Sequence, residues 1–197
     1  MIVVVATGNP GKLVELRELL SGLDLTLRSL ADLGLPSPEE TGKTFEENAE
    51  LKARAAATAA KTWALGDDSG LCVDALGGAP GLYSARYADT DESRRARLLR
   101  ELSGVPAERR GAHFFCAAAL CGPDGRIFRA EGRVDGAIAT APRGTNGFGY
   151  DPLFLPAESP GRTLAELPSE EKNGLSHRGR ALLRLRPVLE ALSRRGH

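Results

Sequence analysis

The chain has 197 residues and a mass of 20.9 kDa, enough for a substantial core in one domain, or in one domain with two lobes. Its 26 basic and 26 acidic residues balance, so no overall charge draws it to nucleic acid or to an anionic membrane. Three cysteines without C-x-x-C spacing, and only three histidines, argue against a disulfide framework and a structural zinc site.

The first segment predicts a buried strand followed by a helix. Residues 1–6 are a continuous apolar run, too short for a signal peptide or a membrane span, so we expect a cytoplasmic protein. Asn9 suits a helix N-cap, and Pro10 suits the first helical position. Lys12 in the first turn is unfavourable against the helix dipole unless an anion binds there, which makes this turn a candidate phosphate site. The alternative is a glycine turn without a ligand, and the spacing after Gly8 excludes a Walker loop.

A second strand is expected within residues 23–30, followed by a loop over 31–41 that ends in an acidic pair. Thr44 fits a capping box, and the alanine-rich stretch 46–62 predicts a helix. Lys52 lies inside this helix, where a solvated side chain is the alternative to a ligand-binding one.

The most unusual residues are the adjacent carboxylates Asp67 and Asp68, between the strand-like segments 63–65 and 71–73. Two carboxylates at one point are costly unless a cation or a proton relieves their repulsion. In an extended segment their side chains point to opposite faces. A tight turn is the alternative interpretation, because Asp, Ser and Gly are common turn residues.

The middle of the chain predicts mainly structural elements. An ordered loop is expected over 74–87, then a helix capped by Thr90, then a hairpin of strands 112–120 and 126–134. Strands alternating with helices, with a hairpin added, indicate an α/β chain with a mixed sheet. Four arginines on the middle helix are interpreted as a solvated face: Arg94, Arg95, Arg97 and Arg100.

Glycines and aromatic residues crowd the segment 144–154. Phe148 lies between Gly147 and Gly149, which leave its ring uncovered, and such a ring suits the stacking of a base. Tyr150 is expected in the core instead, as most aromatic residues are.

Two helices are expected in the last segment. Ser169 is predicted to cap a short helix that contains Lys172, and Ser176 to cap the final helix. His177 and Arg178 in the first turn repeat the unfavourable placement of a cation, which a bound anion would resolve.

Taken in order, six motifs resemble those of the Ham1/RdgB-type inosine triphosphate pyrophosphatases across nearly the whole chain. Each motif alone is weak, and six in register are highly specific. They are Thr7-Gly8-Asn9-Pro10-Gly11-Lys12, Thr44-Phe45-Glu46-Glu47-Asn48 with Lys52-Ala53, Asp67-Asp68-Ser69-Gly70-Leu71, Gly77-Gly78-Ala79-Pro80-Gly81, Phe148-Gly149-Tyr150-Asp151-Pro152 and Ser176-His177-Arg178-Gly179.

The resemblance implies a single domain over residues 1–197, with an elongated mixed sheet flanked by helices and two lobes that hold the active site in their cleft. It implies a homodimer that depends on Mg²⁺, with Mn²⁺ as the alternative metal. The implied reaction converts ITP, dITP and XTP to the monophosphate and pyrophosphate and so cleans the nucleotide pool.

The resemblance also implies roles for individual residues. Asp68 would be metal ligand and proton acceptor, Glu40 the second metal ligand, and Asp67 a supporting, orienting residue. The phosphates would be held by Thr7, Gly8, Asn9, Pro10, Gly11, Lys12, Lys52 and Lys172, with Ser69 beside them. The base would be held by Phe148, Gly149, Tyr150, Asp151, His177 and Arg178.

Two other functions remain open from the sequence. The chain could be a sensor that binds a purine triphosphate without cleaving it, which the intact Asp67-Asp68 pair disfavours. It could also be a related pyrophosphatase of the Maf type that acts on pyrimidine or modified nucleotides.

Overall fold

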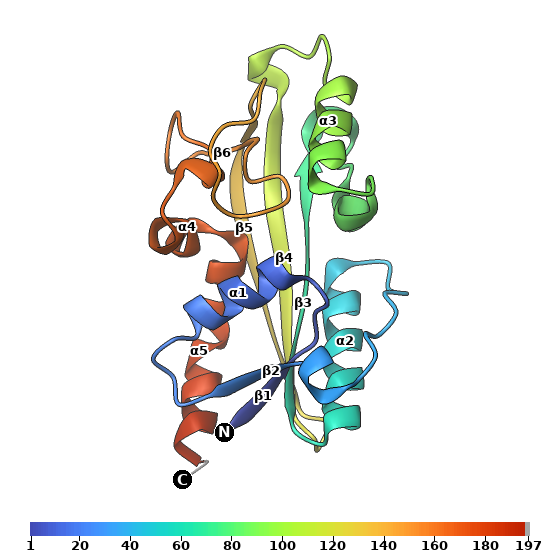
Figure 1. Cartoon of the computed structure of the whole chain (residues 1–197), viewed down its shortest axis with the longest axis vertical. Coiled ribbons are helices and arrows are strands. Elements are labelled where there is room, and N and C mark those ends of the chain that lie inside the picture. Colours follow the sequence, from blue (N-terminus) through green and yellow to red (C-terminus); the bar gives the residue numbers. More distant parts are fainter. Residues whose placement is uncertain (196–197) are drawn as a thin grey trace. The chain divides into compact units, whose positions relative to one another are not determined.

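The computed structural model describes residues 1–195 and has a mixed α/β fold (Figure 1). The strands are β1 (Ile2–Val5), β2 (Thr26–Ser29), β3 (Trp63–Val73), β4 (Gly111–Cys121), β5 (Ile127–Ile138) and β6 (Phe154–Pro156). The α-helices are α1 (Pro10–Leu19), α2 (Phe45–Ala60), α3 (Asp91–Glu101), α4 (Ser169–Leu175) and α5 (His177–Arg195).

The six strands form one sheet in the order β2-β1-β3-β4-β5-β6. Strand β1 pairs in parallel with β2 and with β3, whereas β5 pairs antiparallel with β6. The turn between β4 and β5 is closed by the Gly122 N–H, which donates to the Arg126 carbonyl at 2.8 Å. The predicted mixed sheet and the predicted hairpin are therefore confirmed.

The chain divides into two compact units. Unit 1 contains residues 1–68, residues 116–132 and the chain from Arg178 onward, and unit 2 contains residues 69–115 and 133–177. Strands β3, β4 and β5 each pass from one unit into the other. That residues 1–197 form a single domain stays a prediction.

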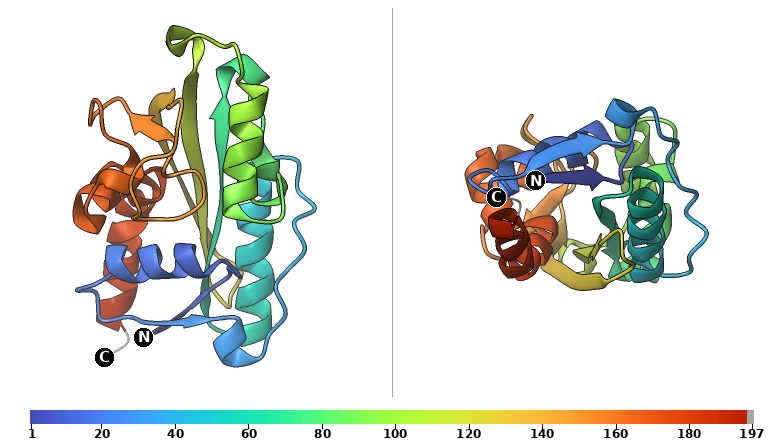
Figure 2. Two further views of the ribbon diagram at one scale, coloured as in Figure 1. Left: turned by 45° about the horizontal axis from the view of Figure 1, so that its top comes forward. Right: turned by 90° about the horizontal axis from the view of Figure 1, so that it is seen from below.

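In unit 1, α1 and α5 cover one face of the strands and α2 covers the other (Figures 1 and 2). Val3, Val5 and Leu65 from the strands are fully buried against apolar side chains of α1 and α5. On α2 the buried positions recur at helical spacing, and they consist of four alanines together with Asn48 and Lys52. Two polar side chains thus lie on the face of α2 that packs against the sheet.

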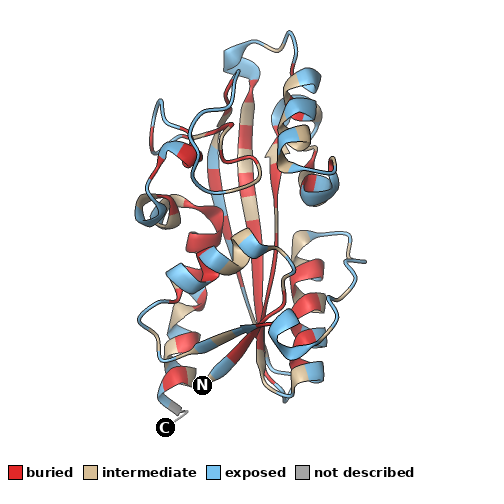
Figure 3. Cartoon of the chain, viewed as in Figure 1, coloured by how far each residue is buried: buried red, intermediate tan, exposed pale blue. Residues whose placement is uncertain are grey.

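The aspartate pair lies inside β3, which runs without interruption from Trp63 to Val73 and is buried along most of its length (Figure 3). The alternative of a tight turn is therefore wrong. Gly66 has no side chain, and this allows α2 to pack closely on the strand. A Cβ at Gly66 would lie 2.2 Å from the carbonyl oxygen of Ala49 and 2.8 Å from the backbone nitrogen of Ala53.

The close approach at Gly66 predicts a large effect of one methyl group. We expect Gly66→Ala to lower the free energy of unfolding by about 3 kcal/mol, because the helix backbone cannot move aside as a side chain can. Gly174→Ala is the matched control, since an added Cβ there meets nothing within 4 Å. Thermal unfolding checks both variants. Equal midpoints for the two would contradict the proposed packing of α2 on β3.

Unit 2 has its own hydrophobic core. It is built around Phe154 and Leu153 and includes Leu98 of α3, all three of which are fully buried. Thr90 caps α3 as predicted, since its side chain accepts a hydrogen bond from the Ser93 backbone N–H at 3.1 Å. The N-cap of α4 is Pro168 and makes no side-chain capping bond, so the predicted Ser169 cap is wrong by one position. Among residues 1–195, none of the helices combines the length and the apolar character that crossing a bilayer requires.

Candidate active site

Asp67 lies at the centre of a buried ionic cluster in unit 1, and its side chain is 2% exposed. Lys12 of α1 contacts its Oδ1 atom. The Nε atom of Arg178 in α5 donates to Oδ2 at 2.9 Å, and the thiol of Cys116 lies 3.1 Å from the same oxygen. Arg178 is also paired with Glu15, which is buried on α1.

The cations of this cluster decide the charge of Asp67. Burial by itself would raise the pKa of Asp67, but the charges of Arg178 and Lys12 outweigh it and hold this pKa well below its usual range. Burial and the neighbouring Asp67 raise the pKa of the Cys116 thiol well above its usual value, so the thiol is protonated and donates. Asp67 therefore stays ionised near neutral pH, and its ion pair fixes the position of the Lys12 side chain.

Asp68 points to the other face of β3, as the alternation of side chains along a strand predicts. Its Oδ2 atom accepts a hydrogen bond from the side chain of Asn48 at 3.0 Å, and its Oδ1 atom lies 3.0 Å from the ammonium of Lys52. The same ammonium lies 2.9 Å from a carboxylate oxygen of Glu40. The loop before α2 and the strand β3 therefore bring two carboxylates onto one cation.

The environment of Asp68 differs from that of its neighbour. Burial raises the pKa of Asp68 above its usual value, although Lys52 and Lys12 act in the opposite direction. Burial lowers the pKa of Lys52, but Asp68, Asp67 and Glu40 outweigh this effect, so the lysine keeps its proton. The surroundings of the two aspartates therefore differ, because Asp67 is paired with two cations and Asp68 with one.

Glu40 and Asp68 fit the donor set of a hard divalent cation. Mg²⁺ prefers oxygen ligands and usually takes one or two carboxylates together with phosphate oxygens of a substrate. Both carboxylates already converge on a cation, the Lys52 ammonium, within 3.0 Å. No group of three or more His, Cys, Asp or Glu residues arranged to hold a metal is found among residues 1–195.

The turn before α1 has the geometry that the sequence predicts. The Asn9 side chain accepts from the backbone N–H of Lys12 at 3.2 Å, and Pro10 occupies the start of the helix. The Thr7 hydroxyl oxygen accepts from the backbone N–H of Asn9 at 3.1 Å. These bonds fix the first turn of a ten-residue helix, whose positive dipole end and Lys12 can both face an anion.

In unit 2 the predicted base residues form a second cluster. The Lys172 ammonium lies 2.5 Å from Asp151 Oδ2 and 5.2 Å from the centre of the Phe148 ring. The same carboxylate oxygen accepts from the backbone N–H of Phe148 at 2.9 Å. Asp151 and Lys172 are each 5% exposed, and Gly147 leaves room for them, since a Cβ there would lie 2.1 Å from Asp151.

Other predicted residues are placed as follows. Tyr150 is buried as expected and donates its hydroxyl to the carbonyl of Ser84 at 2.9 Å. The ring of His177 stacks on Phe114 with centroids 4.7 Å apart. Ser69 follows Asp68 on β3. The described partners of Arg178 are carboxylates of unit 1, and those of Lys172 lie beside Phe148, so a base-binding Arg178 and a phosphate-binding Lys172 stay predictions.

Several residues of these clusters were not predicted from the sequence. Glu15 and Asn48 carried a usable signal, because each is a polar residue among the buried positions of its helix, and on α2 Asn48 shares those positions with Lys52 and four alanines. Cys116 had none, since a cysteine in an apolar strand is a common core residue. Asp91 and Arg95 of α3 contact Gly149. Arg95 was interpreted only as part of a solvated face, and Asp91 was not singled out.

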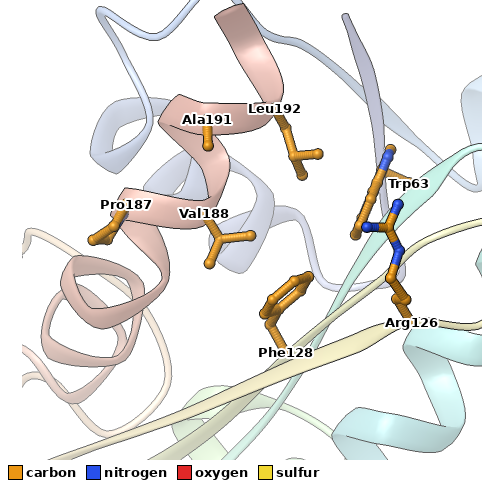
Figure 4. Close-up of a pocket in the computed structure, with 7 residues that line it drawn as sticks. All are labelled: Trp63, Arg126, Phe128, Pro187, Val188, Ala191 and Leu192. Atoms are coloured by element: carbon orange, nitrogen blue, oxygen red, sulfur yellow. The ribbon is translucent and has the colours of Figure 1, made fainter. Parts of the chain in front are cut away.

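A pocket of about 300 Å³ in unit 1 holds none of the predicted residues (Figure 4). Its walls are apolar side chains of α5 and aromatic rings of β3 and β5, with one arginine at the edge. The lining residues are Trp63, Arg126, Phe128, Pro187, Val188, Ala191 and Leu192. The predicted site residues therefore lie in the two polar clusters and not in this pocket.

Comparisons with known proteins identify the family of this chain. A sequence model of the Ham1 family matches residues 3–188. A protein of Geobacter sulfurreducens called dITP/XTP pyrophosphatase is 55% identical over 190 residues, which are 94% of this chain and 95% of that protein.

Solved structures give the same result. A HAM1 protein from Coxiella burnetii superposes with a TM-score of 0.84 at 43% identity, covering 96% of this chain and 98% of that one. A protein from Mycobacterium abscessus, described as a nucleoside-triphosphatase and dITP/XTP pyrophosphatase, has a TM-score of 0.71 at 49% identity and covers 95% and 100%. The matches extend over almost the whole sequence and the whole fold, and the chain therefore belongs to the Ham1 family.

Proposed function

We propose that this protein is a nucleoside-triphosphate pyrophosphohydrolase that converts dITP, ITP and XTP to the monophosphate and pyrophosphate. The observation that carries the proposal is the buried Asp67-Asp68 pair, in which each carboxylate is paired with a different lysine. The relatives named dITP/XTP pyrophosphatase support the same substrate class.

The phosphates are assigned to unit 1. Lys12 and Lys52 supply positive charge, and the N-terminus of α1 supplies backbone N–H groups and a dipole. These groups stabilise the charge that develops on the departing pyrophosphate. Glu40 and Asp68 would hold Mg²⁺, or Mn²⁺, and the bound metal would neutralise phosphate charge.

Asp68 is assigned as the proton acceptor. A water oxygen attacks the α-phosphorus, the bond from that phosphorus to the bridging oxygen of the β-phosphate breaks, and pyrophosphate leaves. The proton of the water passes to a carboxylate oxygen of Asp68. The Asn48 and Lys52 contacts hold this carboxylate in place for the proton transfer.

The base is assigned to unit 2, where the Phe148 ring offers a stacking surface. Hypoxanthine and xanthine carry a 6-keto acceptor where adenine carries an amino donor. A pocket that donates to the keto oxygen leaves donor facing donor when adenine enters, and such a mismatch gives strong discrimination.

A turnover panel tests the substrate class. Pyrophosphate release is measured with Mg²⁺ and dITP, ITP, XTP, ATP, GTP, dTTP and UTP. We expect the three deaminated purine nucleotides to be turned over much faster than the others. A preference for dTTP or UTP would favour the Maf-type function, and binding without turnover would favour a sensor.

Lys12→Ala tests the assignment of the phosphates. We expect it to weaken binding of ITP more than binding of IMP, because Lys12 should contact a phosphate beyond the α position. Calorimetric titration without metal, so that ITP is not consumed, measures both affinities. Lys43→Ala is the control, since Lys43 is an exposed lysine at the start of the same unit's helix α2. An equal loss for ITP and IMP would contradict the role of Lys12.

We also propose that the protein is a homodimer, as the family resemblance implies. Sedimentation equilibrium tests this directly. A mass of about twice 20.9 kDa is expected, and a mass of 20.9 kDa at micromolar concentration would contradict it.

A further inference from the structure

Helix α3 holds the loop that carries Phe148. The Oδ2 atom of Asp91 accepts a hydrogen bond from the backbone N–H of Gly149 at 2.8 Å. The Nη1 atom of Arg95 donates to the carbonyl oxygen of Gly149 at 2.7 Å. Asp91 and Arg95 are four residues apart on the helix, so they share one face. Both polar backbone atoms of the residue after Phe148 are therefore held by one helix.

The other side of Phe148 is fixed as well. Its backbone N–H donates to Asp151, which is paired with Lys172, and the Lys172 ammonium faces the ring. Gly149 has φ +60°, a left-handed conformation that residues other than glycine rarely adopt. Because the backbone of Gly149 has this freedom, the two contacts from α3 add a restraint on the C-terminal side of Phe148.

The contacts of Asp91 and Arg95 differ from those of an ordinary charged surface. Arg95 is half-buried, and Asp91 uses its second oxygen to accept from Arg94 at 2.7 Å. Arg100 lies on the same helix and is exposed, and its side chain makes no described hydrogen bond or ion pair within residues 1–195. Asp91 and Arg95 thus hold Gly149, whereas the Arg100 side chain has no comparable contact.

We propose that Asp91 and Arg95 are positioning residues for base recognition. This rests on the proposed function, in which Phe148 stacks on the base. Neither residue touches the substrate. Each acts through the backbone of Gly149, so that the ring is already ordered before the nucleotide binds and less conformational entropy is lost on binding.

Steady-state kinetics with dITP tests this role. Stacking of one base on an aromatic ring contributes roughly 5- to 150-fold to affinity. If the Phe148 ring is less well ordered, part of that affinity is lost. We expect Arg95→Met to raise KM about tenfold with kcat within about twofold, the pattern of lost ground-state binding. Arg100→Met, the matched change on the same helix, should leave both constants unchanged.

A double-mutant cycle separates positioning from general damage to unit 2. If Arg95 acts through the ring, Arg95→Met should add less than about twofold to KM when Phe148→Ala is already present. An equal rise of KM in both backgrounds, or no rise in the single variant, would overturn the inference. A wild-type protein that releases no pyrophosphate from dITP would instead overturn the proposed function itself.

Asp91 is tested by a conservative pair. Asp91→Asn keeps an oxygen that can accept from Gly149, whereas Asp91→Ala does not. We expect the alanine variant to raise KM as Arg95→Met does, and the asparagine variant to restore most of the wild-type value. If both variants have the same KM for dITP, the hydrogen bond from the Gly149 N–H to Asp91 does not affect base binding, and the positioning role of Asp91 is overturned.

Discussion

Asp68→Asn should lower kcat for dITP by about a thousandfold, the middle of the range for loss of a general base. Asparagine has the shape of aspartate and can still contact Asn48 and Lys52, but it cannot take the proton of the attacking water. It is also a poorer metal ligand, which adds to the loss. Pyrophosphate release under saturating dITP and Mg²⁺ measures the effect.

The matched control for Asp68→Asn is Asp124→Asn in the turn between β4 and β5, where the carboxylate is 48% exposed. This control should keep full activity, and the melting temperature of Asp68→Asn should stay within a few degrees of the wild type. Turnover by Asp68→Asn within about threefold of the wild type would remove Asp68 from its assigned role.

Asp67→Asn should act on stability instead. It removes one charge from a buried cluster and leaves Arg178 and Lys12 with a neutral partner. Breaking a buried ion pair by removing one member costs about 3–5 kcal/mol. In a chain of this length that loss corresponds to a melting temperature lower by roughly 10 °C. Thermal unfolding followed by circular dichroism measures it.

Asp135→Asn is the control, because Asp135 is 63% exposed and paired with the exposed Arg133. Surface pairs of this kind contribute about 0–1 kcal/mol, so its melting temperature should hardly change. If Asp67→Asn unfolds at the wild-type temperature while its activity falls a thousandfold, the roles of the two aspartates are the reverse of those assigned.

Much of the fold could be predicted from local patterns. The continuous apolar run before Ala6, the caps Asn9 and Thr44, and the glycine turn at Gly122 each predicted an element that the structure contains. The tight turn that was the alternative interpretation at Asp67 and Asp68 is wrong, because turn propensity describes isolated residues. Here, cations from three helices neutralise the pair and allow it to remain inside a buried strand.

The candidate site was only partly predictable. Residue type and spacing identified Lys12, Lys52 and the aspartate pair, and the alternation of side chains along a strand separated the two aspartates. The partners of those residues depend on packing between segments far apart in sequence. Arg178 and Asp67 are 111 positions apart, and no local pattern relates them. The same holds for Arg95 and Gly149, which are 54 positions apart.

The distribution of charge also explains why one aspartate could be assigned chemistry and the other not. Asp67 is surrounded by Lys12, Arg178 and a protonated thiol, so its charge is fixed. Asp68 shares a single lysine with Glu40, and the proposed metal ligation and proton transfer are therefore assigned to Asp68. Alternation along the strand placed the two side chains on opposite faces, but spacing alone could not assign their roles, and only the family resemblance distinguished Asp68 from Asp67.

The most direct test of the account is the identity of the products. Purified protein is incubated with dITP and Mg²⁺, and the products are separated by anion-exchange chromatography with standards. We expect dIMP and pyrophosphate in equal amounts, with no orthophosphate. Formation of dIDP and orthophosphate, or recovery of intact dITP, would contradict it.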